Sequence, residues 1–133
     1  MDKFTISKLA ESCDVKNDTV RYYERSGLIQ PIGHTKAGYR LYDQESIRKL
    51  KFIKKAQSLG FKLEEIKNLL YFDHSDKATA NDVLNITKNK VLEIKQRDKE
   101  LKLILKILEK LVDLCPGEGP TSECPILDYI YPK

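Results

Sequence analysis

The sequence of 133 residues contains no tryptophan, only two histidines and one methionine, and it lacks any long apolar run. A membrane-spanning helix needs at least about 18 apolar residues in succession, and no segment of this chain comes near that length. The first residues, MDKFTISKLAES, also lack the apolar stretch of a signal peptide. We therefore expect a cytoplasmic protein that has no membrane partner.

The side-chain patterns of common active sites are missing as well. No paired carboxylates stand out, and neither a Ser–His nor a Cys–His arrangement is recognisable. Two histidines are few for a protein that would rely on acid–base catalysis near neutral pH. The sequence therefore predicts that the protein is not an enzyme.

Positive charge is concentrated in the first half of the chain. Residues 1–72 contain 14 Lys and Arg against 9 Asp and Glu, whereas residues 73–133 contain 10 against 11. A basic segment favours an anionic partner, of which nucleic acid is the commonest. A solvated lysine-rich surface would give the same counts, so charge alone leaves both interpretations open.

The amino-terminal pattern predicts two short helices joined by a tight turn. Residues 4–12 and 15–25 are the two helices, Cys13 and Asp14 form the turn, and Gly27 follows the second helix as a typical C-terminal cap. The second helix is rich in polar and basic side chains. This arrangement has the shape of a helix-turn-helix.

A hairpin with a cationic tip is expected next. Residues 28–32 and 39–42 are the candidate strands, and the turn-forming residues 33–38 separate them. A helix-turn-helix that is followed by such a hairpin, or wing, is suited to DNA. Recognition helices present the side chains of their first turn to base edges, and here these are Lys16, Asn17 and Thr19. Lys36 and His34 at the tip would add phosphate contacts.

Two further helices and a polar hinge connect this region to the second half. Asp43 is a natural N-cap for a helix that runs to about Leu59, where Gly60 ends it. Residues 63–72 form the next helix, and its first turn is acidic, as the helix dipole favours. Residues 73–82 are polar and contain no candidate core residue.

The longest periodic pattern covers residues 82–114. It contains neither Gly nor Pro, and its mostly apolar positions alternate in steps of three and four, which is typical of a coiled coil. An isolated helix cannot bury such a stripe, so we expect a partner helix; packing against the chain's own first half is the alternative. We call this stripe the heptad seam; it consists of Leu84, Thr87, Val91, Ile94, Asp98, Leu101, Leu105, Leu108 and Val112.

Two of the three cysteines frame a Pro- and Gly-rich loop, CPGEGPTSEC, and Cys115 continues the heptad seam by one step. Structural disulfides are rare in the cytosol, so the pair Cys115 and Cys124 indicates a metal-binding loop or a thiol–disulfide sensor. Thiolates select soft ions such as Cu(I) or Zn(II). Cys13 is interpreted as a small buried residue, and Asp73 and His74 as surface residues rather than zinc ligands.

Three blocks of the sequence resemble the signature blocks of the MerR family of bacterial transcription regulators: TVRYYERSGLI, GYRLYD and KFIKKAQSLGFKLEEIKNLL. The tail CPGEGPTSECPIL resembles the metal-binding loop of the copper-efflux regulator subfamily. The resemblance implies a homodimer that holds its long helices antiparallel on double-stranded promoter DNA. Metal binding would then make the dimer distort the promoter, so that RNA polymerase can use it.

The resemblance also implies a fold class and a division of the chain. The fold would be mainly α, with a winged helix-turn-helix and helical connector in residues 1–72. Residues 73–133 would hold the coiled-coil dimerisation helix and the C-terminal metal-binding loop. Matching the family blocks onto this chain implies DNA contacts for Asn17, Arg21, Tyr22, Tyr39 and Arg40.

The resemblance further implies that Cys115 and Cys124 bind Cu(I), with Ag(I) as a close substitute. Two thiolates suffice for a monovalent d¹⁰ ion, whereas Zn(II) takes about four ligands. In the zinc, cadmium and lead branches a further cysteine begins the partner's long helix, but residues 79–82 here contain none. The copper branch has a serine near Ala80. A sensor of another thiophilic metal, a redox sensor and a metal-storage protein remain alternatives.

Overall fold

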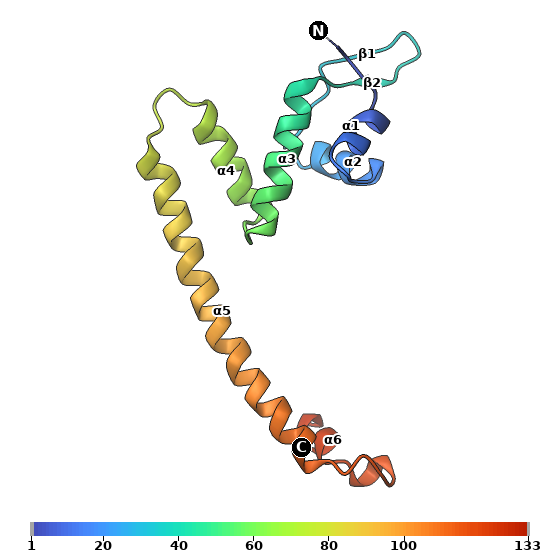
Figure 1. The fold of residues 1–133 in the computed structure, drawn as a ribbon, viewed down its shortest axis with the longest axis vertical. Coiled ribbons are helices and arrows are strands. Elements are labelled where there is room, and N and C mark those ends of the chain that lie inside the picture. Colours follow the sequence, from blue (N-terminus) through green and yellow to red (C-terminus); the bar gives the residue numbers. More distant parts are fainter. Residues whose placement is uncertain (1, 133) are drawn as a thin grey trace. The chain divides into compact units, whose positions relative to one another are not determined.

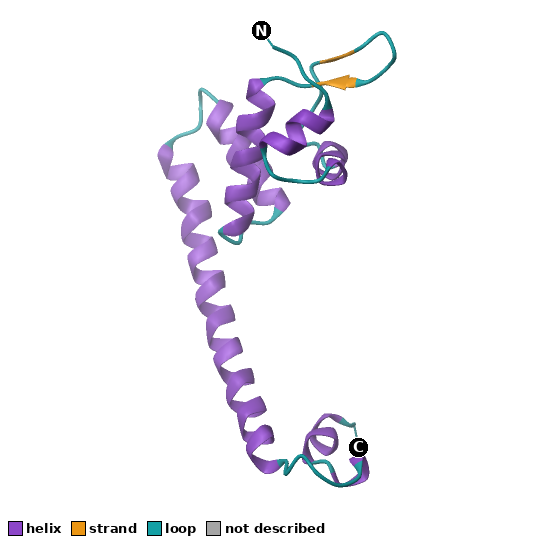
Figure 2. Ribbon diagram, turned by 45° about the vertical axis from the view of Figure 1, so that its right-hand side comes forward, coloured by secondary structure: helices purple, strands orange, loops and turns teal. Residues whose placement is uncertain are grey.

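The computed structural model describes residues 2–132, and these residues form two compact units whose boundary lies between Ile86 and Thr87. The described residues are mainly helical, and their only sheet is a two-stranded hairpin (Figures 1 and 2). The longest helix, α5, begins in the first unit and continues into the second. The functional division predicted between residues 72 and 73 remains a prediction.

The first unit opens with the predicted pair of short helices, α1 (Ile6–Ser12) and α2 (Asn17–Arg25). Asp14 in the connecting turn has a left-handed backbone with φ of 54°, which sharpens the change of direction. Leu9 and Val20 are fully buried where the helices meet. Burial of such side chains is the main force that holds two helices of this length together, because short helices are marginal on their own.

The wing is shorter than predicted. Strand β1 (Gly33–His34) pairs antiparallel with β2 (Arg40–Leu41), and residues 28–32 are not a strand. The expectation failed because Leu28 and Ile29 are consecutive and both buried in the core, whereas a strand turns successive side chains to opposite faces. The segment thus leaves α2 as a core-filling connection.

Helices α3 (Gln44–Ser58) and α4 (Leu63–His74) complete the first core. Asp43 caps α3 as predicted, since its side chain accepts a hydrogen bond from the backbone N–H of Ser46, 3.1 Å away. Helix α4 extends two residues beyond its predicted end at residue 72, so Asp73 and His74 are helical. The core side chains of α3 and α4 include Leu50, Ile53 and Ile66.

Helix α5 (Ala80–Leu114) begins two residues before its predicted start. The carboxylate of Asp82 accepts a hydrogen bond from the backbone N–H of Thr79 at 2.9 Å, which stabilises the first turn. Beyond α5 lie a 3₁₀ turn, Thr121–Glu123, and the short helix α6 (Pro125–Ile130). Among the described residues, none of the helices has the length and hydropathy to span a membrane.

Candidate DNA interface and cysteine loop

The first turn of α2 carries the side chains predicted to read base edges. Lys16 is the N-cap residue and is exposed, while Asn17 and Thr19 are half-buried. The Asn17 side-chain amide donates a hydrogen bond to the Ser7 hydroxyl of α1, 3.2 Å away. Asn17 is thus held by the neighbouring helix, whereas Lys16 is free to turn towards a polyanion.

One turn later, Arg21 and Tyr22 lie on the exposed side of α2. Arg21 forms an ion pair with Asp18 on the same helix, with Nη1 2.7 Å from Oδ1. Asp18 is almost fully exposed, and such surface pairs are weak, so the guanidinium can exchange this partner for a phosphate or a base. The Tyr22 ring is about half exposed. Both residues are therefore accessible to a ligand that approaches α2.

The wing tip is a turn organised by Thr35. Its backbone carbonyl accepts from Gly38, its side-chain oxygen accepts from the backbone N–H of Tyr39, and its own N–H donates back to the Tyr39 carbonyl. Gly38 has φ of 90°, a conformation that favours glycine. The turn leaves the side chains of Lys36 and Tyr39 exposed to solvent.

Glu24 links α2 to the wing and is a residue that the sequence analysis missed. Its Oε2 lies 3.2 Å from Nη1 of Arg40, and its Oε1 accepts a 2.5 Å hydrogen bond from the Tyr42 hydroxyl. Burial, followed by the hydrogen bond to Glu24 and its negative charge, raises the pKa of Tyr42 far above the ordinary value, so the hydroxyl stays a donor. The structure thus brings Arg40 together with α2. The one local signal for Glu24 was its position three residues after Arg21 on the same helix, and no local pattern indicated its contact with Arg40.

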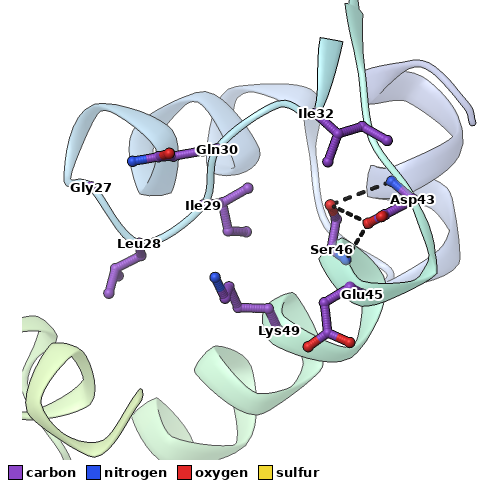
Figure 3. Close-up of a pocket in the computed structure, with 9 residues that line it drawn as sticks. All are labelled: Gly27, Leu28, Ile29, Gln30, Ile32, Asp43, Glu45, Ser46 and Lys49. Atoms are coloured by element: carbon purple, nitrogen blue, oxygen red, sulfur yellow. Dashed lines mark hydrogen bonds between the residues drawn. The ribbon is translucent and has the colours of Figure 1, made fainter. Parts of the chain in front are cut away.

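A cavity of about 310 Å³ lies next to this region, between the connection after α2 and the start of α3 (Figure 3). Its wall includes the buried Leu28 and Ile29 and the side chain of Lys49. Asp43 and Ser46, also in the wall, are hydrogen-bonded to each other as part of the α3 cap. None of the residues predicted to contact DNA lines the cavity, so we assign it no part in the interface.

Cys13 is buried in the helix-turn-helix, as predicted. Its thiol lies 3.6 Å from the Ile47 carbonyl of α3, and its burial raises the pKa of the thiol. A buried, protonated thiol is a poor metal ligand and a poor nucleophile.

The other two cysteines stand at the two ends of one loop in the second unit. The backbone N–H of Cys115 closes the last turn of α5, and Cys124 is the N-cap residue of α6, with Pro125 in the first turn. Gly117 and Gly119 have φ values of 75° and 92°, so the loop uses conformations that other residues rarely adopt. Both thiols are free and partly exposed.

The donor set of this loop fits a soft ion that accepts few ligands. Within residues 2–132, no group of three or more His, Cys, Asp or Glu side chains is arranged to hold a metal. Cys115 and Cys124 are therefore the two soft donors that the chain offers at this site. Two thiolates complete the ligand set of a two-coordinate ion, whereas a four-coordinate ion would still lack two of its ligands.

Two family models match this chain and together cover most of it. The model described as "MerR HTH family regulatory protein" matches residues 4–72, and the model described as "MerR, DNA binding" matches residues 47–111. The chain belongs to the MerR family. As a MerR-family transcription regulator it is not an enzyme, as the missing active-site patterns predicted.

Curated relatives match this chain over nearly its whole length. A mercuric resistance operon regulatory protein from Bacillus cereus is 40% identical over 131 residues, which cover 98% of this chain and 99% of that protein. The transcriptional regulator CueR from Escherichia coli is 32% identical over 125 residues, which cover 94% of this chain and 92% of CueR. The resemblance to the MerR family is thus confirmed, whereas the copper-efflux subfamily is not singled out among these relatives.

A solved structure of a transcription regulator has the same fold. The transcription regulator PbrR691 from Ralstonia metallidurans, crystallised in complex with lead(II), matches with a TM-score of 0.81 at 26% identity, covering 96% of this chain and 99% of that one. The predicted fold class is confirmed: a helix-turn-helix with a small wing, the long helix α5 and a short C-terminal region. Because a mercuric and a lead(II)-bound regulator are among the relatives, family membership leaves the metal open.

Proposed function

We propose that this MerR-family regulator is a homodimer that binds promoter DNA and activates transcription when Cu(I) or Ag(I) binds to Cys115 and Cys124. The observation that carries the choice of metal is the donor set: two thiols frame the loop, and no third donor group is arranged near them in the described part of the chain. A monovalent d¹⁰ ion needs no more than two thiolates.

The proposed metal also agrees with the residue at the start of α5. Ala80 begins this helix, and its side chain has no ligand atom. The α5 helix of a partner subunit would therefore add no thiolate to Cys115 and Cys124. A divalent ion such as Zn(II) would then depend on water or on distant side chains to reach about four ligands.

The exposed seam of α5 supports the proposed homodimer. Leu101, Leu105 and Val112 are each more than half exposed in the single chain, and Leu84 and Leu108 are nearly so. An apolar stripe of this length on one helix is stable in water only when another surface covers it. A second copy, with its α5 antiparallel, would cover the whole stripe and place Cys115 at the end of the interface.

The exposed side chains of α2 and the wing support promoter binding. Arg21, Tyr22, Tyr39 and Arg40 are accessible, and Lys16 and Lys36 add positive charge for phosphates. In this proposal the metal-loaded dimer distorts the promoter so that RNA polymerase can engage both of its elements.

A regulator that responds to Hg(II) is the second candidate, because the mercuric regulator of Bacillus cereus is 40% identical over nearly the whole chain. Hg(II) is also a soft d¹⁰ ion that two thiolates can bind. A thiol–disulfide sensor is a third candidate, because both thiols are free and partly exposed.

One experiment separates these candidates. Reduced protein is titrated without oxygen with Cu(I), Ag(I), Hg(II) or Zn(II) against a competing chelator, and transcription is measured from a promoter that the purified protein binds. We expect one ion per subunit and activation by Cu(I) and Ag(I). Activation by Hg(II) or Zn(II) but not by Cu(I) or Ag(I) would refute the copper proposal, and activation by peroxide without metal would favour the disulfide sensor.

A further inference from the structure

The Glu24 carboxylate has a buried partner and an exposed partner. One oxygen accepts a hydrogen bond from the buried Tyr42, and the other pairs with the half-exposed Arg40. Tyr42, which donates to Oε1, is fully buried, and its backbone is hydrogen-bonded in both directions to Phe4. The Glu24 side chain is only 13% exposed, whereas that of Arg40 is 50% exposed. The carboxylate is therefore a fixed anchor, and half of the arginine is left free for a ligand.

This ion pair contributes little to folding stability, because Arg40 is half solvated and screened. Its consequence is geometric. A long arginine side chain on a two-residue strand would otherwise sample many rotamers, and each would have to be frozen when DNA binds. The contact with Glu24 restricts the rotamers of Arg40 before DNA binds. Because Glu24 lies on α2, the contact also sets the position of the Arg40 side chain relative to that helix.

We infer that Glu24 is a positioning residue for DNA recognition: it holds the Arg40 side chain against α2, so that the wing and α2 contact DNA as one surface. The inference rests on the proposed DNA contact of Arg40. Glu24 itself touches no base in this proposal.

Long-range electrostatics and positioning predict opposite results when Glu24 loses its charge. A carboxylate beside a DNA-binding surface repels phosphates, so simple electrostatics predicts that its removal strengthens binding to every duplex. Positioning predicts that binding to the specific site weakens, because Arg40 becomes free to move, while binding to unrelated DNA is unchanged or stronger. The ratio of the two affinities is therefore the decisive quantity.

The test uses the full-length protein and two duplexes: one selected by the wild-type protein from a random pool, and a scrambled duplex of equal composition. Fluorescence anisotropy at fixed salt gives both dissociation constants. We expect Glu24→Gln to weaken binding to the selected duplex about tenfold without weakening binding to the scrambled one. Glutamine keeps an oxygen that can accept from Tyr42 but loses the charge that holds Arg40.

Glu45→Gln is the matched control. Glu45 lies in the first turn of α3, where it pairs with Arg48, and its replacement removes the same charge from the same unit. It should leave the affinity ratio unchanged. The double variant Glu24→Gln/Arg40→Ala should bind the selected duplex no more weakly than Arg40→Ala alone, because Glu24 acts through Arg40.

Tyr42→Phe provides a second route, should the glutamine variant fail to fold in thermal unfolding measurements. It removes the hydroxyl that holds the carboxylate but keeps the ring, and a lowered affinity ratio is again expected. The inference is overturned if Glu24→Gln, or the phenylalanine variant in its place, retains the wild-type ratio, or if the losses of Glu24→Gln and Arg40→Ala are additive. A wild-type protein that does not distinguish the two duplexes would overturn the proposed function as well.

Discussion

The Lys54 ammonium group of α3 donates a hydrogen bond to the backbone carbonyl of Cys13, 2.7 Å away. Cys13 is the C-cap residue of α1, and the carbonyls at a helix end have no partner within the helix. A charged donor from a third helix therefore closes the turn of the helix-turn-helix. This contact ties the turn to α3.

We predict that Lys54→Met lowers the free energy of unfolding by about 1.5 kcal/mol, the lower end of the range for a hydrogen bond from a charged group, because Lys54 is only half-buried. Methionine keeps much of the apolar stem but cannot donate. Urea unfolding followed by circular dichroism measures the effect. Lys55→Met, at an exposed neighbouring position, is the control and should change stability little. Equal stability of the two variants would show that the Lys54 contact is not formed in solution.

Arg21→Ala and Arg40→Ala should each weaken binding to the promoter by roughly 1–3 kcal/mol if the arginine contacts a base, and by less if it contacts phosphate. Binding should also fall as salt rises, because DNA releases counterions on binding. Gel-shift titrations at several salt concentrations measure both effects. Arg48→Ala removes a charge from α3 outside the predicted interface and serves as the control. An unchanged shift for either arginine would exclude it from the interface.

Leu101→Lys and Leu105→Lys should each convert the homodimer into monomer or aggregate. Each variant places a charge inside the heptad seam, where it would lose its hydration without gaining a partner. Analytical ultracentrifugation at micromolar concentration measures the association. Leu103→Lys is the matched control, because Leu103 is also exposed on α5 but lies off the seam. A wild-type protein that sediments as a monomer would contradict the proposed dimer.

Cys115→Ser and Cys124→Ser should each abolish activation by metal while DNA binding persists. Serine keeps the size of the side chain but replaces a soft thiolate with a hard, protonated oxygen. Reporter activity and gel shifts, measured on the same variants, separate the two functions. Cys13→Ser should respond to metal like the wild type, since Cys13 is buried in the other unit. A full response without either loop cysteine would remove that residue from the metal site.

Stability should decrease at alkaline pH, in part through Cys13. Burial raises the pKa of the folded thiol above its ordinary value of 9.0, so the folded state holds this proton more tightly than the unfolded state. The contribution is complete below the unfolded pKa and is lost as pH rises through the folded pKa. Urea unfolding at about pH 8 and about pH 10 should therefore show a smaller decrease for Cys13→Ala than for the wild type. Equal decreases would contradict the prediction. Tyr23 and Tyr42, whose pKa values are also raised, remain in both proteins.

The sequence by itself determined most of the local elements and the family. Asp43 as a cap, Gly60 as a stop and Pro125 at the start of the last helix all act within a few residues, so their effects can be read without knowing the fold. The unbroken period of the long helix is likewise a local property. The two loop cysteines were recognisable because their spacing and their Pro- and Gly-rich surroundings are continuous in sequence.

Only the tertiary structure decided where the wing begins and what holds it. Leu28 and Ile29 are residue types that favour strands, but both side chains are buried in the core. The strand pairing of the wing therefore starts at Gly33. The contact between Glu24 and Arg40 is equally absent from any local pattern, because the two residues lie on different elements. Packing and ion pairing join residues that are distant in sequence, and their geometry exists only once the elements have docked.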